Sequence, residues 1–228
     1  MKKNLIIVGL VILALLTLDQ VIKIYIKTYF AAEQHHYLLG NWFAIHFIEN
    51  QGMAFGTTFG SAIWHKLALS IFRVVAIGFI AYYILKEAKK GAKLSFLIAM
   101  GFIWAGATGN LIDSMFYDFF FSFNPCDRFN YLEGSKQFAD CMVDGRAFPV
   151  EVRHRGFLLG NVVDMFQFDV LWPKWVPYFG GGQIFPAIWN VADASITTGV
   201  AIIIIRQKSF FAKTPKQHIE TKEADEKL

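Results

Sequence analysis

The sequence has little of the charge that a soluble domain of its 228 residues would carry. Asp, Glu, Lys and Arg together make up 18% of the chain, whereas ordinary soluble domains contain about 25%. Hydrophobic residues reach 55% and aromatic residues 17%, with 24 Phe among them. This balance excludes an ordinary soluble globular domain and indicates a membrane protein.

The motifs of common metal-dependent and serine hydrolases are also missing. The sequence has no HExxH pair, no Cys and His set with metal-ligand spacing and no G-x-S-x-G elbow. Among the six His residues, His35 and His36 are adjacent on a predicted outer loop, which is more typical of exposed side chains than of ligands. We therefore expect neither a metal nor a cofactor.

The net charge of +4 is not distributed like a nucleic-acid interface. The basic residues gather in "MKK" at the start, "KEAKKGAK" at 86–93 and "RQKSFFAKTPK" at 206–216. Clusters that flank apolar segments are typical of cytoplasmic loops of membrane proteins, so we expect no nucleic-acid partner.

Four apolar segments each approach the roughly 20 residues that a helix needs to cross a bilayer. They are residues 5–25, 65–85, 94–112 and 185–205. The first lacks a small-x-small cleavage site and is interpreted as a retained anchor. It also has no Cys, so the chain is not itself a lipoprotein precursor.

With four spans, all three basic clusters lie on one side of the membrane. That side is expected to be the cytoplasm, with both termini there, and the intervening segments then face the periplasm or exterior. We expect one membrane-embedded domain over 1–206, followed by a polar cytoplasmic tail over 207–228.

The outer segments predict a small sheet and an insertion. "YLLGNWFAIHFIENQGMAFG" at 37–56 alternates, is rich in aromatics and contains turn residues, which is typical of short strands at a membrane interface. The outer-side insertion at 114–156 carries both cysteines, Cys126 and Cys141. An outward location permits a disulfide, and two free thiols remain an alternative. The expected fold is thus a mainly α membrane protein with four transmembrane helices, a small outward-facing β-sheet and this insertion.

Four carboxylates are expected at one depth, in the outer leaflet. Asp19 and Asp113 end the first and third spans, where a cap or a solvated terminus explains them equally well. Asp164 comes from the outer segment before the fourth span. Asp193 lies inside that span, about 12 Å below its outer start, and an intramembrane carboxylate indicates a functional site.

Two asparagines accompany these carboxylates at the same spacing. Asn110 and Asp113 are separated by three positions, as are Asn190 and Asp193. Residues at this spacing share a helix face. We therefore predict that each asparagine side chain orients an aspartate or the backbone of a substrate.

Five sequence blocks carry a resemblance to a known family. They are "LDQVIK" at 18–23, "ENQGMAFG" at 49–56, "GNLID" at 109–113, "NVVDMF" at 161–166 and "NVAD" at 190–193. In this order and at these places relative to four spans, they resemble lipoprotein signal peptidase (signal peptidase II). That family consists of bacterial inner-membrane aspartyl peptidases with a small periplasmic sheet called a cradle.

The resemblance implies a function and a set of site residues. The family cuts the signal peptide of a prolipoprotein before a cysteine that carries diacylglyceryl. Asp164 and Asp193 match the catalytic pair. The residues that match supporting or substrate-binding positions are Asp19, Asn50, Asn110, Asp113 and Asn190. The expected partners are this lipid-modified substrate and membrane lipid, and we expect a monomer.

The chain departs from the family pattern in two places. Many members have an arginine directly after the "GNxxD" aspartate, where this chain has Ser114. Arg73, in the outer half of the second span, could replace it or could simply extend toward the interface. The insertion at 114–156 is the second departure, and it could shield the site, widen the lipid-facing surface or bind a partner.

Two other functions fit parts of the sequence. A proton- or ion-coupled transporter also needs carboxylates in its spans, although no inverted repeat relates the first pair of spans to the second. A membrane interaction protein would explain the aromatics and the insertion. It would not explain two aspartate motifs at one depth.

Overall fold

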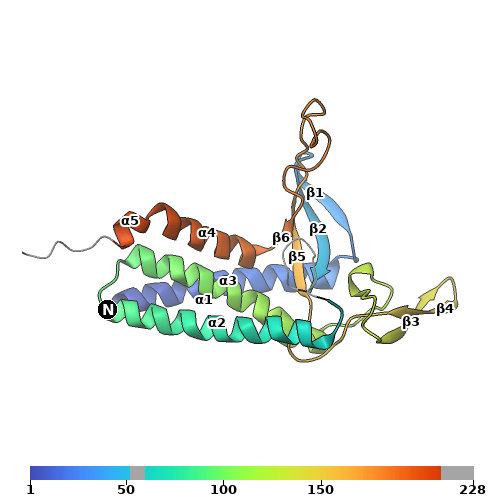
Figure 1. Ribbon diagram of the computed structural model, residues 1–228, viewed down its shortest axis with the longest axis horizontal. Helices are drawn as coiled ribbons and strands as arrows, with labels where there is room; N and C mark the ends of the chain where they lie inside the picture. The colour runs from blue at the N-terminus through green and yellow to red at the C-terminus, as the bar shows by residue number, and fades with distance from the viewer. Residues whose placement is uncertain (52–59, 212–228) are drawn as a thin grey trace, which may run out of the picture.

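The computed structural model describes residues 1–51 and 60–211 and consists of a helix bundle with a sheet at one end (Figure 1). The bundle contains α1 (Lys2–Tyr29), α2 (Ile63–Lys89), α3 (Leu94–Phe120) and the shorter α4 (Val191–Ile205). The sheet contains β1 (His35–Leu39), β2 (Phe43–Asn50), β5 (Val162–Phe168) and β6 (Ile188–Trp189). The remaining elements are a 3-10 helix (Arg128–Asn130), β3 (Phe138–Val143), β4 (Arg146–Glu151) and α5 (Gln207–Phe210).

Helices α1, α2 and α3 are each long and apolar enough to cross a membrane. They contain the predicted segments 5–25, 65–85 and 94–112. Helix α3 continues to Phe120, so the first residues of the predicted insertion are helical rather than part of a loop. They stay helical because one side of this last part packs inside the protein, where Ser114 and Tyr117 are buried.

The fourth predicted segment, 185–205, was placed too early. Helix α4 begins only at Val191, because the preceding Ile188 and Trp189 pair with strand β5. Asn190 is extended and caps the helix, so it does not share a helical face with Asp193. Asp193 therefore lies in the first turn of α4 and not two turns below its start.

Helices α3 and α4 pack closely through glycines. A Cβ on Gly106 would collide with the carbonyl oxygen of Ala192, and one on Gly199 with that of Ala99. Small residues let helix backbones approach in a membrane, where apolar side chains gain little from leaving lipid. This close contact fixes the start of α4 against α3.

The predicted interfacial sheet is present, with antiparallel strands in the order β1-β2-β5-β6. In β5, Val163 and Met165 pack in a buried cluster with Ile26 and Tyr117. Side chains alternate between the two faces of a strand, so Asp164 points the other way. The sheet thus presents one carboxylate on the face opposite this cluster.

The insertion forms a hairpin of β3 and β4 that projects beyond the ends of the helices (Figure 1). A disulfide joins Cys126 to Cys141 in β3, which decides between the two alternatives for these residues. At the base of the insertion, Arg153 forms an ion pair of 2.7 Å with Asp118 of α3.

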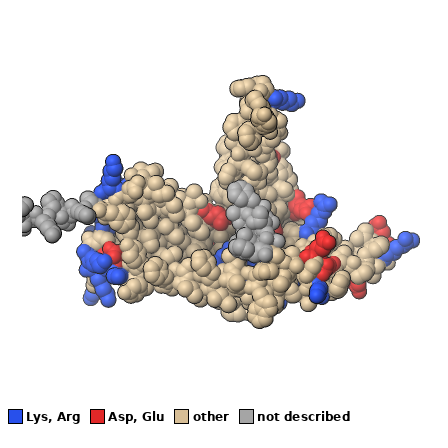
Figure 2. Space-filling view, in the orientation of Figure 1, with Lys and Arg blue, Asp and Glu red and all other residues tan. Residues whose placement is uncertain are grey.

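Basic side chains gather at the bundle end that carries the N-terminus, while the middle of the helices shows an uncharged surface on the face in Figure 2. The first residues of the predicted tail form α5, and Phe210 packs against Phe96 of α3. The tail from residue 212 lies outside the described residues.

Candidate active site

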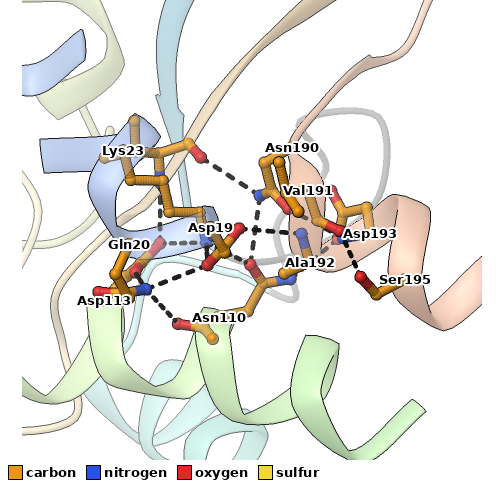
Figure 3. A network of polar contacts seen from close by, with 12 residues as sticks. Asp19, Gln20, Lys23, Asn110, Asp113, Asn190, Val191, Ala192, Asp193 and Ser195 are labelled. Atoms are coloured by element: carbon orange, nitrogen blue, oxygen red, sulfur yellow. Dashed lines mark hydrogen bonds and ion pairs between the residues drawn. The ribbon is translucent and has the colours of Figure 1, made fainter. Parts of the chain in front are cut away.

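The candidate site lies where α1, α3 and the start of α4 meet strands β2 and β5 (Figure 3). Buried polar groups need hydrogen-bond partners, and here they bind one another. The network includes every site residue that the sequence predicted, namely Asp19, Asn50, Asn110, Asp113, Asp164, Asn190 and Asp193.

A buried lysine holds the first two carboxylates. The Nζ atom of Lys23 lies 3.0 Å from Asp19 Oδ2 and 2.8 Å from Asp113 Oδ2, and the lysine side chain is 0% exposed. It also donates a hydrogen bond of 2.8 Å to Asn110 Oδ1. Because a buried charge is costly unless it is paired, this cluster fixes α1 against α3.

Gln20 and the backbone of β5 complete this cluster. Gln20 Nε2 donates to Asp19 Oδ2 at 3.1 Å and to Asp113 Oδ1 at 3.0 Å. Its Oε1 accepts a hydrogen bond of 3.1 Å from the Tyr117 hydroxyl. The Val163 N–H donates to Asp113 Oδ2 at 3.3 Å, which connects α3 to the strand that carries Asp164.

The N-terminus of α4 is held by three side-chain contacts. The Ala192 N–H donates to Asp19 Oδ1 at 2.9 Å, and the Asp193 N–H donates to the capping Asn190 Oδ1 at 2.9 Å. Asn110 Nδ2 donates to Asp193 Oδ1 at 2.8 Å. The first N–H groups of a helix have no partner inside the helix and favour negative charge nearby, so this end suits the Asp193 carboxylate.

Asp164 is 1% exposed and accepts hydrogen bonds on both oxygens. Asn190 Nδ2 donates to Oδ1 at 2.6 Å, and Asn50 Nδ2 donates to Oδ2. Burial, followed by the negative charge of Asp193, raises the pKa of the Asp164 carboxyl well above its ordinary value. The environment therefore favours a proton on this carboxyl.

Asp164 and Asp193 line one cavity of about 720 Å³, a size typical of ligand sites. It lies over α3, between residues of α2 and α4, and β5 and β6 line its end. The other polar residues on its wall are Asn50, Arg73, Asn110, Thr197 and Thr198. Most of the wall is apolar and includes Phe72, Phe168, Phe185, Ile188 and Trp189.

Arg73 lines this cavity, whereas Ser114 does not contribute a cation or a cavity wall. Ser114 is buried, and its hydroxyl donates to the Asn110 carbonyl oxygen of its own helix at 3.3 Å. The Arg73 side chain therefore lies at the candidate site rather than extending away from it toward the interface.

Lys23 and Gln20 were not predicted as site residues, although both belong to the block "LDQVIK". A pattern that could have identified the lysine was present. Asp19 and Lys23 are four positions apart on a helix, which favours an ion pair, and an ionisable residue within a span is expected to have a partner.

Comparison with known families matches residues 11–209 to signal peptidase (SPase) II. The chain belongs to the signal peptidase II family. A lipoprotein signal peptidase from Porphyromonas gingivalis is 39% identical over 206 residues, which are 87% of this chain and 81% of the relative. Another from Amoebophilus asiaticus is 31% identical over 231 residues, covering 96% of this chain and 85% of the relative.

Two solved structures share the fold of this chain. A bacterial membrane enzyme matches with a TM-score of 0.57 at 21% identity, over 92% of this chain and 93% of that chain. A second structure of a bacterial membrane enzyme gives 0.55 at 22% identity, over 91% and 94%. Of the family block "ENQGMAFG", only Glu49, Asn50 and Gln51 lie within the described residues.

Proposed function

We propose that the protein is an aspartic endopeptidase that removes the signal peptide from diacylglyceryl-modified prolipoproteins. The observation that carries this proposal is that Asp164 and Asp193 line the same largely apolar cavity. Membership in the signal peptidase II family and relatives named lipoprotein signal peptidase support the substrate class.

The two carboxyls have different roles in the proposed reaction. Asp164 starts protonated, because burial and the charge of Asp193 raise its pKa. Ionised Asp193 removes a proton from a water molecule, and the resulting hydroxide attacks the scissile carbonyl carbon. Asp164 gives its proton to the carbonyl oxygen. The tetrahedral intermediate then collapses as ionised Asp164 takes back a proton from one of its two hydroxyls. The C–N bond breaks, and Asp193 gives the proton it took from water to the leaving nitrogen.

The remaining site residues support this pair. Asn110 and Asn190 orient the carboxyls of Asp193 and Asp164, respectively, through amide donors. Asn50 donates to the second oxygen of Asp164. Asp19 and Asp113 position the start of α4 and strand β5 through their backbone contacts.

We propose four spans over one domain, 1–206, with the site facing the outside, cytoplasmic termini and a monomeric chain. Helix α4 has 15 residues, or about 22 Å at the rise of an α-helix, which is short of the bilayer core of about 30 Å. Backbone without helical bonds is tolerated at membrane depth where it is buried in protein or lines a cavity. The capped, cavity-lining start of α4 satisfies that condition.

The lipid on the substrate is proposed to deliver the scissile bond. A soluble peptide would have to desolvate its backbone groups to enter a buried site. Two acyl chains instead hold the substrate in the leaflet, since each buried CH₂ contributes about 0.8 kcal/mol. Anchoring then supplies much of the positioning.

The decisive experiment is a paired digestion by purified protein in lipid bilayers. Diacylglyceryl-modified prolipoprotein should be cut and should shift in size, whereas the unmodified form of the same sequence should be cut far more slowly. Equal rates would indicate a general membrane aspartyl protease. No cleavage, combined with proton flux across the bilayer, would favour the transporter instead.

A further inference from the structure

A long loop between β5 and β6 forms an ordered projection, which we name the finger (residues 170–185). Its two sides are joined by hydrogen bonds from Ile184 N to Val170 O at 2.8 Å and from Trp172 N to Gly182 O at 2.8 Å. At its turn, a Cβ on Gly180 would collide with the carbonyl oxygen of Lys174. The finger therefore holds its side chains in defined positions.

The finger exposes large apolar side chains that no part of the described chain covers. Tyr178 is 103% exposed, Trp175 81% and Phe179 62%. Tyr178 also has a φ of 66°, a region that bulky residues rarely adopt. Lys174 is the one charged residue between positions 170 and 185, and no acidic residue lies there.

The direction of the finger relates this apolar surface to the membrane. The sheet and the finger project to one side of the helix bundle, past the start of α4 (Figure 1). The three long helices each carry an exposed aromatic residue at the end next to the sheet, namely Tyr29, Trp64 and Phe120. Such residues are typical of a membrane interface, so they mark the level of the outer one. Because the finger projects sideways from the bundle at that level, it runs along the bilayer surface next to α4.

We propose that the finger docks on the lipid interface of the outer leaflet, with Trp175, Tyr178 and Phe179 among the acyl-headgroup boundary. Tyr and Trp are enriched at this depth because one end of each ring system is polar and the other apolar. Lys174 faces lipid phosphates, and the absence of acidic residues from 170–185 removes the repulsion that these phosphates would otherwise cause.

The finger is continuous with the candidate site. Phe185 at its base lines the cavity together with Ile188 and Trp189 of β6. Docking the finger on lipid thus fixes the outer wall of the cavity at the membrane surface. Lipid contact by the finger rests on the proposed orientation of the chain, but not on the proposed cleavage reaction.

The test uses nitroxide labels on single cysteines, because the two native cysteines are joined in a disulfide. Trp175→Cys and Tyr178→Cys place labels on the finger, and Glu133→Cys places a control on the exposed surface of the insertion. Collision rates with oxygen and with a water-soluble nickel chelate are measured in phospholipid nanodiscs without substrate. We expect nickel collisions about fivefold lower at 175 and 178 than at 133, with oxygen collisions raised, as for side chains within the interface.

Equal nickel accessibility at 133, 175 and 178 would overturn the proposal. Protection of 175 and 178 that arises only on adding prolipoprotein would also overturn it, because the finger would then bind substrate rather than lipid. Labelling of Glu133→Cys in spheroplasts by a membrane-impermeant thiol reagent tests the orientation separately. This control distinguishes a chain inserted with the opposite orientation from a correctly oriented chain whose finger stays in water.

Discussion

Two pairs of aspartates lie in one network but have different partners. Asp19 and Asp113 share the ammonium group of Lys23. Asp164 and Asp193 accept hydrogen bonds from asparagine amides and line the cavity. The first pair lies against a cation that is wholly buried. In the second pair, burial together with the negative charge of Asp193 raises the pKa of Asp164.

This difference separates carboxylates that build the site from carboxylates that can react. An ion pair with a buried lysine holds a carboxylate in place, which suits it to joining helices. An amide donor keeps a carboxyl oriented without supplying charge, so its proton remains available for chemistry. The residue type alone does not distinguish the two pairs, whereas their partners do.

The largest expected effect concerns the pair that lines the cavity. Asp164→Asn and Asp193→Asn should each lower the rate of prolipoprotein cleavage at least about a thousandfold, because an amide can neither accept a proton from water nor donate one as an acid. The thermal unfolding midpoint should change little, since the amide keeps the shape of the carboxyl. Asp140→Asn, on the exposed hairpin, is the matched control and should keep full activity. Normal turnover by either dyad variant would contradict the assignment.

The second effect concerns the buried cation. Lys23→Met leaves two buried carboxylates without their partner and should lower the free energy of unfolding by about 3–5 kcal/mol. Lys90→Met removes an exposed pair with Glu87 and should cost about 0–1 kcal/mol. Thermal unfolding in detergent measures both. Asp113→Asn in the Lys23→Met background should recover part of the loss. If Lys23→Met were as stable as the parent, Lys23 would not stabilise Asp19 and Asp113, and the proposed difference between the two pairs of carboxylates would be wrong.

The pH dependence tests the cavity pair more finely. The pKa of Asp164 lies well above its ordinary value, so activity that needs this proton should persist at pH values where an ordinary Asp is ionised and fall as pH rises through the raised pKa. The stability contribution of this group has the same sign. The folded state binds the proton more tightly, so stability is lost as pH rises from about 4, the pKa of an unfolded Asp.

Infrared difference spectra of the protonated Asp164 carboxyl follow its titration directly. In Asp193→Asn the pKa of Asp164 should fall, because the like charge is gone, yet stay above the ordinary value, because burial remains the first cause. An unchanged titration would mean that the two carboxyls do not interact.

The smallest expected effect concerns Asn190, which serves both as the cap of α4 and as a donor to Asp164. Asn190→Ala loses both contacts and should lower stability by about 1 kcal/mol. Asn190→Ser keeps a capping oxygen and should recover that stability, while cleavage stays impaired in both variants because the amide donor is absent. Full activity of Asn190→Ser would assign this residue to the helix alone.

The sequence predicts the long helices well and the start of α4 poorly, for a physical reason. A long apolar run predicts a segment buried in the membrane. Helices α1, α2 and α3 are each apolar over a length sufficient to cross it, so they could be predicted. The residues before Val191 are also mostly apolar, but Ile188 and Trp189 pair with a strand distant in the sequence. Hydropathy does not record which backbone partner a residue takes, so helix and strand could not be separated there.

The sequence predicted which residues the structure brings together in the candidate site, but not their division into two pairs with different partners. The motif blocks identified all seven aspartates and asparagines, and the structure brings them into one network. The partner of Asp19 and Asp113 is Lys23, whose ion pair with Asp19 follows from local helix spacing. Its pair with Asp113 of α3 depends on tertiary packing, which one sequence does not reveal.

The hydrogen bond from the Ala192 N–H to Asp19 joins residues separated by 173 positions. A chain is synthesised from its N-terminus, so Asp19 enters the membrane long before the strand and helix that carry Asp164 and Asp193. Until α4 has inserted, Asp19 of α1 lacks its contact with the Ala192 N–H, and the cavity lacks the carboxyl of Asp193. Under the proposed function, the protein is therefore inactive while it is being made, and the completion of its own synthesis acts as the activating step.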